Sequence, residues 1–440
     1  MPETSGSKSI FRNPLLSSAV LVLATLMLQA CQSPAETPRQ RPTLEPSSAE
    51  IIDTYIAIAR ASYGDSLAAA RTLDTAIDRL LEAPSALALD AAREAWKDAR
   101  VPYQQTEAYR FGNSVVDEWE GRVNAWPLDE GLIDYVDTGT YGLESDNNYF
   151  YAANIIANPL IDIGGISVDA AMITPQLLAE TLHEIDGVEA NVATGYHAIE
   201  FLLWGQDLNG TEPGAGDRPW TDYALEDQCT NANCERRRDY LKSASTLLVS
   251  DLEEMVQNWE EGGAALEDLR VKGDDGGLAT ILTGMGSLAY GELAGERIRL
   301  GLLLHDPEEE HDCFSDNTHW SHYYDAVSIS NVYRGEYVRP DGSRVEGASL
   351  EDLIRVRNPA LHAEMSARLE STQLAMDAMV RQGEMGNTFD VLIGLGNTAG
   401  EELVNRVVTS LMEQTRSIEG VINELQLQNV SIEGSSSLPE

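Results

Sequence analysis

Positive charge is scarce in this chain, and so are long apolar runs beyond its first thirty residues. The 440 residues hold 30 Lys and Arg against 72 Asp and Glu, for a net charge of -42. Such a surface repels phosphate groups, so we expect no binding to nucleic acid. Acidity alone is weak evidence for a metal, because many acidic surfaces serve solubility. No stretch after residue 30 is apolar enough to cross a bilayer.

Residues 1–30 are predicted to be a lipoprotein signal peptide. Lys8 and Arg12 form a positive n-region, and residues 15–28 form an apolar run too short for a comfortable membrane span. Leu-Gln-Ala precedes Cys31, so cleavage there would leave a cysteine that accepts the lipid. An ordinary secretory signal with an incidental cysteine is the alternative. Gln32 favours an outer-membrane anchor facing the periplasm, with membrane contact through the lipid only.

The remainder of the chain exceeds what one hydrophobic core usually reaches, which suggests two packed units. Residues 31–48 are rich in Pro, Ser, Thr and Gln and are expected to be a flexible tether. We expect an N-terminal helical bundle at 49–210, a C-terminal helical bundle at 235–430 and a disordered tail at 431–440.

Sustained alternating strands are also hard to find, and apolar residues recur instead at three- and four-residue spacing. The pattern predicts helices over 51–81, 85–111, 174–203, 235–260, 278–304, 350–382 and 399–427. Loops are expected at 112–169, 206–233, 262–277 and 305–347, with one hairpin from 327–337 and 343–345. Amphipathic helices of this length must bury their apolar faces against one another, so an all-α pair of bundles is predicted.

Cysteine is rare as well, with four in the chain. Cys229 and Cys234 lie in a loop-like run, where an oxidising compartment would favour a small disulfide. A zinc knuckle is the alternative, although three sulfurs at these spacings match no usual zinc pattern. Cys313 is then unpaired, or it pairs with one of the other two.

The most informative segment runs from Gly195 to Trp204. His197 and Glu200 lie three residues apart, which on a helix sets an imidazole and a carboxylate on one face, able to bind one cation. Two ligands make half of a metal site. A buried core histidine is the alternative for His197 considered by itself.

Three other segments hold residues that could complete such a site. Glu107 and Arg110 share a helix face and are most simply explained as a surface ion pair. Glu292 and Glu296 also share a face, with Arg299 one turn beyond Glu296, and there an ion pair of Glu296 with Arg299 and a ligand role are equally supported. Four glycines within residues 284–295 imply close approach of the backbone to another helix or to a ligand. The third segment, 308–320, is dense in metal-ligand residue types, but by composition alone it is a solvated loop.

Taken together, these segments resemble the imelysin family, and within it the iron-regulated protein A branch. The resemblance rests on Gly195-x-His197-x-x-Glu200, on 105–112, on 122–129 with Asp129, on 284–297, and on 310–319 with Asp316 and His319. Tyr109 and Asp312 depart from the Phe and Ser expected there. The resemblance implies two helical bundles with a cleft between them, a location in the bacterial cell envelope, and a link to iron uptake. It also implies a nominal metallopeptidase.

A missing histidine decides between binding and hydrolysis. Helical zinc-protease signatures place two histidines and a carboxylate base on one helix. Position 201, where the second histidine would fall, is Phe201. A carboxylate and a histidine at this spacing resemble the ligands of iron sites in helical bundles more than they resemble the zinc-protease signatures. Metal binding is therefore favoured over peptide cleavage.

The resulting hypothesis is a lipid-anchored envelope protein that binds a divalent or ferric ion, with iron favoured and zinc possible. His197 and Glu200 are its expected ligands. The candidates to complete the shell are Glu107, Glu292, Glu296 and Asp316. The expected supporting residues are Arg110, Asp129, Gly195, Arg299 and His319. A metal-chelate ligand and iron-transport components are the expected partners, and a zinc peptidase or a metal-free peptide- or glycan-binding protein are the alternatives.

Overall fold

The computed structural model describes residues 44–438, which belong to one compact unit. The signal peptide, Cys31 and most of the tether lie outside the described residues. The described chain is mainly helical, which confirms the predicted all-α class. Within residues 44–438, no helix combines the length and apolar character needed to cross a bilayer.

Seven α-helices of the described chain are 15 residues or longer. They are α2 (Ser48–Glu82), α3 (Ala86–Gln104), α7 (Cys234–Asn258), α9 (Gly273–Ser287), α11 (Thr318–Arg334), α13 (Pro359–Gly383) and α15 (Thr398–Leu425). The shorter α-helices are α4 (Ser114–Asn124), α5 (Pro175–Leu177), α6 (Gly195–Trp204), α8 (Ala264–Val271), α10 (Leu300–Leu304), α12 (Leu350–Arg357) and α14 (Phe389–Ile393).

Tighter and wider helical segments connect them. The 3₁₀ segments are η1 (Glu107–Tyr109), η2 (Glu130–Leu132), η4 (Ile185–Gly187), η5 (Trp220–Tyr223), η6 (Glu226–Gln228) and η8 (Pro307–Glu309). The π-helical segments are η3 (Leu178–Leu182) and η7 (Leu288–Arg299). Two antiparallel hairpins pair β1 (Leu160–Ile163) with β2 (Ile166–Asp169), and β3 (Glu336–Val338) with β4 (Arg344–Glu346).

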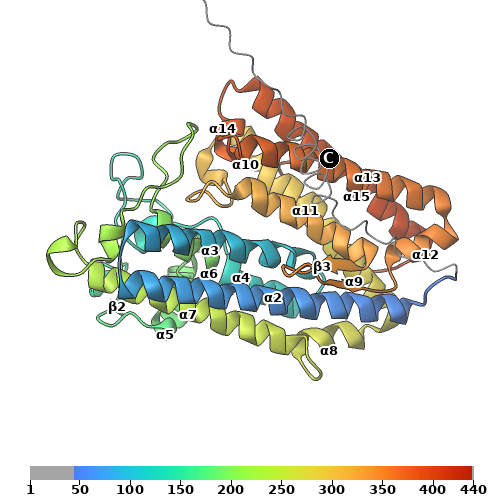
Figure 1. The fold of residues 1–440 in the computed structure, drawn as a ribbon, viewed down its shortest axis with the longest axis horizontal. Coiled ribbons are helices and arrows are strands. Elements are labelled where there is room, and N and C mark those ends of the chain that lie inside the picture. Colours follow the sequence, from blue (N-terminus) through green and yellow to red (C-terminus); the bar gives the residue numbers. More distant parts are fainter. Residues whose placement is uncertain (1–43, 439–440) are drawn as a thin grey trace, which may run out of the picture. The chain divides into compact units, whose positions relative to one another are not determined.

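The first long helix illustrates how local sequence sets an element. Ser47 accepts a hydrogen bond from the Glu50 amide, and the Glu50 carboxylate accepts one from the Ser47 amide, which forms a capping box. Along α2, Ile51, Tyr55 and Ile58 recur on one buried face. That face packs against α3 and α7, which run beside α2 (Figure 1).

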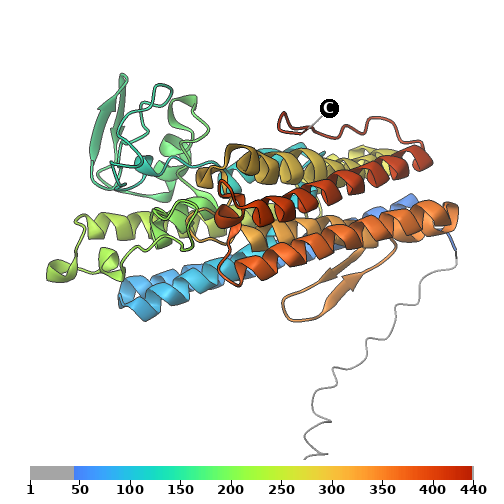
Figure 2. The ribbon, with the colours of Figure 1, turned by 90° about the horizontal axis from the view of Figure 1, so that it is seen from above.

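The structure places α7 beside α2, although the sequence assigns the residues of α7 to the C-terminal bundle. A second group consists of η7, α11, α13 and α15, with α13 packed along α15 (Figure 2). Both groups contribute to the single compact unit, and the bundle boundary between residues 210 and 235 stays a prediction.

Several segments that were expected to be loops are helices. α4 lies within 112–169, α8 within 262–277 and α11 within 305–347. In α11, polar residues fill much of the buried face, so no apolar period marks the helix. The hairpin expected from residue 327 begins at Glu336, and the β1–β2 hairpin was missed altogether.

The helix expected over 174–203 is broken into α5, η3, η4 and α6. Glu184 and Asp186 have φ of 55° and 63°, in the left-handed region where a right-handed helix cannot continue. The break leaves α6 as a separate helix of ten residues, all of them buried.

Residues 431–438 pack along η7, where a disordered tail was expected for 431–440; residues 439 and 440 lie outside the described part of the chain. This C-terminal segment folds back from the end of α15 (Figure 2). The Glu433 amide donates to Ser287 Oγ at 3.0 Å, and Ser437 Oγ donates to the Gly295 carbonyl at 2.9 Å. The glycines of η7 lack side chains, which leaves room for this segment.

Candidate metal centre

Gly195 sets the position of α6, the helix that carries His197 and Glu200. Its φ is +79°, and a Cβ atom built there would lie 2.4 Å from the carbonyl oxygen of Val123. Only glycine fits both the conformation and the contact. The start of α6 therefore rests directly on the end of α4.

His197 and Glu200 contact each other. The distance from His197 Nδ1 to Glu200 Oε2 is 2.9 Å, and both side chains are buried. Ser315 donates to Glu200 Oε1 from its amide at 3.0 Å and from its hydroxyl at 2.7 Å. When Glu200 accepts from Nδ1, the Nε2 lone pair of His197 is left free. Glu200 thus orients the histidine, as carboxylates commonly do behind metal-bound imidazoles.

His197 Nε2 is buried and has no hydrogen-bond partner. His311 and Asp312, from the loop between η8 and α11, bring their ligand atoms within 4.8 Å of that of His197 and of each other. The two imidazole rings are 4.7 Å apart and nearly perpendicular. One helix and one distant loop therefore supply two imidazoles and one carboxylate to a single point.

Arg100 of α3 balances the charge of Asp312. Its guanidinium donates to Asp312 Oδ1 at 2.9 Å, and Asn317 and Ser321 donate to Oδ2. Burial opposes ionisation of Asp312, but Arg100 and His311 outweigh it and hold the pKa of this carboxyl well below its usual range. Asp312 is therefore an anion at neutral pH.

The two histidines are neutral. Burial, with Arg100 next in importance, lowers the pKa of His197 to about 3. Burial, followed by Arg297, also lowers the pKa of His311 well below its usual value. Neutral imidazoles and an ionised carboxylate are the protonation states that metal ligands require. The donors present fit a metal ion.

Two of the other predicted ligands lie elsewhere and already have partners. Glu107 and Glu292 both accept from Arg297, at 2.7 and 2.8 Å, and Arg297 also contacts Asp325 at 3.1 Å. Arg110 donates to Glu292 at 3.1 Å. Because guanidinium groups already neutralise these carboxylates, this cluster is a buried ion network.

Asn124 connects that network to the histidines. Its amide donates to Glu120 at 3.1 Å, while its carbonyl oxygen accepts from Arg100. Glu120 in turn lies 3.6 Å from Arg110. A chain of buried polar contacts thus runs from Asp312 to the ion network.

The remaining predicted residues are dispersed. Glu296 is half-buried on η7, and Arg299 donates to the Ser437 carbonyl at 3.2 Å. Asp129 accepts from Asn148 at 2.6 Å, and His319 packs its ring against Gly383. Asp316 belongs to a separate acidic group with Asp207 and Asp390.

Sequence reasoning missed the residues that complete the histidine group. His311 and Asp312 stood in a segment rich in ligand residue types, but its composition also fits a solvated loop. Arg100 lies on a regular helix, where an arginine carries no functional signal. The signal that could have found His311 and Asp312 was the 310–319 motif of the family resemblance, which contains both residues.

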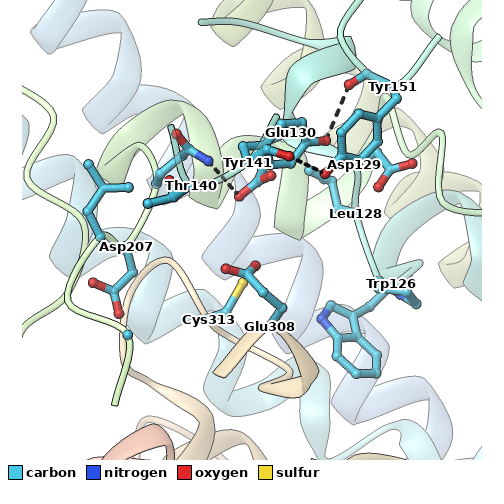
Figure 3. A pocket seen from close by; sticks show the side chains of 14 residues that line it. Trp126, Leu128, Asp129, Glu130, Thr140, Tyr141, Tyr151, Asp207, Glu308 and Cys313 are labelled. Atoms are coloured by element: carbon cyan, nitrogen blue, oxygen red, sulfur yellow. Dashed lines mark hydrogen bonds between the residues drawn. The ribbon is translucent and has the colours of Figure 1, made fainter. Parts of the chain in front are cut away.

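Two pockets flank the buried group. The first, of about 330 Å³, is lined by Trp126, whose ring lies 5.7 Å from that of His311. Figure 3 shows Glu308 and Cys313 in this pocket, with Glu130 and Tyr141 across from them. The second, of about 590 Å³, includes Ser315, the residue that donates to Glu200, along with Asp316 and His319.

Acids in the first pocket are held partly neutral. Burial, followed by repulsion from the negative charge of Glu308, raises the pKa of Glu130 to about 8. Burial also raises the pKa of Glu308 to about 7.

The cysteines lie outside the histidine group: Cys229 and Cys234 form a disulfide, and Cys313 is a free thiol.

Known proteins resemble this chain in sequence. The family model described as Imelysin matches residues 59–418. Iron-regulated protein A of Synechococcus elongatus is 24% identical over 323 residues, which are 72% of this chain and 72% of that protein.

Solved structures share the fold. A protein provisionally described as an iron-regulated protein A precursor, from Parabacteroides distasonis, superposes with a TM-score of 0.61 at 18% identity and covers 87% of this chain and 97% of its own. An imelysin-like protein from Psychrobacter arcticum gives a TM-score of 0.57 at 18% identity over 88% and 99%.

Proposed function

The chain belongs to the imelysin family, and on that premise we propose that it is a lipid-anchored envelope protein that binds a metal ion through His197, His311 and Asp312. The observation that carries the proposal is the buried Nε2 of His197, which has no hydrogen-bond partner, on a residue that brings a ring nitrogen within 4.8 Å of ligand atoms of the other two residues. An unpaired buried nitrogen costs free energy unless something binds it.

Iron is the favoured ion. Two histidines and one carboxylate are the donor set of many non-haem Fe(II) sites. Ferrous iron accepts imidazole more readily than magnesium or calcium does, and a buried anion such as Asp312 offsets part of its charge. One relative carries the name iron-regulated protein A. We propose iron acquisition as the process, with a metal ion or its chelate as cargo and iron-transport components as partners.

Zinc hydrolysis is the second candidate, because two histidines and a carboxylate also form catalytic zinc sites. The histidine that α6 lacks is supplied by the distant loop. A peptidase further needs an open position and a free carboxylate base. The three donors are at most 2% exposed, and Glu200 is occupied by His197 and Ser315. Burial of the donors favours binding over cleavage.

Aromatic residues near the histidines would favour the alternative of a metal-free protein that binds a peptide or a glycan. Trp126 and Tyr141 line the first pocket beside the histidines, whereas Trp204 packs against Trp96 in the core. Because Trp126 also lies 5.7 Å from the ring of His311, the pocket suits the organic part of a metal chelate.

Metal analysis of the full-length protein in detergent tests the proposal. The protein would be stripped with a chelator, titrated with Fe(II) without oxygen and with Zn(II), and analysed for bound metal. We expect about one ion per chain in the wild type and at least about tenfold weaker binding in His197→Ala and His311→Ala, because each loses a ligand.

His362→Ala is the matched control, because it removes a histidine from α13, outside the group, and should bind metal as the wild type does. Equal affinity in the wild type and both ligand variants would refute the site. Peptide cleavage that requires metal and vanishes in both ligand variants would establish the peptidase instead.

We propose an outer-membrane anchor facing the periplasm for the location. Cys31→Ser should move the protein from the membrane fraction to the soluble periplasmic fraction, and mass spectrometry of the wild type should find a lipidated N-terminal cysteine. An unmodified N-terminus at another residue would contradict the anchor.

A further inference from the structure

A second group of carboxylates lies beside the loop that carries His311. Asp207, Asp316 and Asp390 bring one oxygen each within 4.8 Å of one another. They come from three segments far apart in the chain: the turn after α6, the loop before α11, and α14. Three separate segments thus bring negative charge to one point, which is costly unless something offsets it.

Glu310 adds a fourth acid from inside the protein. Its side chain is 1% exposed, and Oε1 has no hydrogen-bond partner. The charges of Asp390 and Asp316 act on this carboxyl, although its oxygens lie outside the group of three aspartates. A buried carboxylate oxygen with no donor, next to two further acids, is an arrangement that a cation would stabilise.

The buried carboxylate of Asp390 likewise lacks hydrogen-bond donors. It is fully buried, and neither of its oxygens makes a hydrogen bond of ordinary geometry, although Thr388 and the Val391 amide lie near enough to affect its charge. The positive charge of Lys97 favours ionisation of Asp316, but this effect is smaller than those of burial and of the neighbouring acids. The group thus differs from the Arg297 network, where guanidinium groups occupy the carboxylates.

We propose that Asp207, Asp316 and Asp390 form a second cation site that takes calcium. All the donors are oxygens, which suits a hard cation, and no imidazole takes part. Carboxylates from separate segments suit the flexible six- to eightfold shell of Ca²⁺ better than the strict octahedron of Mg²⁺. Asp316 and Thr388 line the pocket of about 590 Å³, so water can reach the ion and complete its shell.

The loop 310–316 would serve both sites. His311 and Asp312 belong to the histidine group, while Asp316 belongs to the acidic group. An ion at either site would order the same residues. Calcium should therefore raise the affinity of the histidine site, and the reverse coupling should be equal.

Calorimetric titration of the metal-stripped full-length protein with CaCl₂ tests the proposal. We expect wild-type binding at or below about 1 mM, within the range of extracellular calcium sites. Asp390→Asn and Asp207→Asn should each weaken binding at least about tenfold, since each removes a charged ligand. Asp207 is only half-buried, so that variant should fold even if Asp390→Asn does not, and circular dichroism checks both.

Two controls make the outcome specific. Asp98→Asn removes one exposed charge from the same pocket and should leave calcium affinity within about twofold. The double variant His197→Ala, His311→Ala should also bind calcium as the wild type does. Absence of wild-type binding at millimolar calcium, or unchanged affinity in a folded Asp207→Asn protein, overturns the second site. Calcium binding lost in the histidine variant and retained in both aspartate variants would place the ion at the histidines and overturn it too.

Discussion

At the residue scale, partners distinguish a site from a structural ion network. Glu107 and Glu292 looked as suitable for metal binding as any acid in the chain, yet Arg297 contacts both within 3 Å. His197 Nε2 has no hydrogen-bond partner, because Glu200 contacts the other ring nitrogen, Nδ1, at 2.9 Å. A ligand needs an uncommitted lone pair, and residue type alone does not report one.

Gly195→Ala should destabilise the protein by about 2–4 kcal/mol, because alanine is strained at positive φ and its Cβ would overlap the Val123 carbonyl. Urea denaturation measures the loss. Gly64→Ala is the matched control: it lies within α2 with nothing within 4 Å of a new Cβ, and it should stabilise by about 0.5–1 kcal/mol. Equal effects of the two substitutions would contradict the close contact.

Glu130 should make stability fall as pH rises. Its folded-state pKa is raised to about 8 from an ordinary value of 4.5, chiefly by burial. The folded protein therefore holds a proton that the unfolded chain has released, so this contribution is complete below pH 4.5 and is lost as pH rises through 8.

Glu130→Gln cannot ionise, so it should be more stable than the wild type by about 1–3 kcal/mol at about pH 8.5 and nearly equal to it at about pH 4.5. Chemical denaturation at both values measures the difference. The exposed Glu118→Gln should change stability equally little at either pH. A stability difference for Glu130→Gln that does not grow with pH would contradict the raised pKa.

At the scale of elements, η7 and the C-terminal segment depend on each other. The three glycines at 286, 291 and 295 face that segment: an added Cβ at Gly295 would lie 2.2 Å from Ser435 Cβ, and one at Gly291 would lie 2.7 Å from the Glu433 carbonyl oxygen. The glycines weaken the helix by themselves, and the segment that covers them offsets the loss.

A double-mutant cycle tests this dependence. Gly295→Ala should destabilise the full chain by about 1–3 kcal/mol through overlap with Ser435. In a chain that ends at residue 430 the same change should become neutral or stabilise by up to about 1 kcal/mol, because alanine then improves an uncovered helix. Urea denaturation of the four proteins gives the coupling. Additive effects would show that the segment does not pack on η7.

At the scale of the whole molecule, the net charge of -42 acts against compactness. Raising NaCl from about 10 to about 150 mM shortens the screening length from roughly 30 Å to about 8 Å. The melting temperature of the metal-free protein should therefore rise by a few degrees. KCl should act equally, since screening is not specific, and a flat or falling melting temperature would contradict the effect.

Much of the helical architecture was predictable, because apolar spacing reports which face of a helix is buried. α2, α7 and α15 follow that pattern closely, whereas the helix expected over 350–382 is divided into α12 and α13 at Asn358. α11 does not, since its buried face carries His319, His322 and Asp325. A helix that buries polar side chains loses the periodic signal at the place where it contributes to polar clusters.

The sequence by itself determined the helical class, the close backbone approach at the glycines of η7, and the juxtaposition of His197 with Glu200, because each depends on spacing along one segment. Only the tertiary structure decided which distant groups meet: His311 and Asp312 at the histidine, arginines at Glu107 and Glu292, and two more acids at Asp316. Helix periodicity records the direction in which a side chain points. The segment that it meets there is set by the packing of the whole chain.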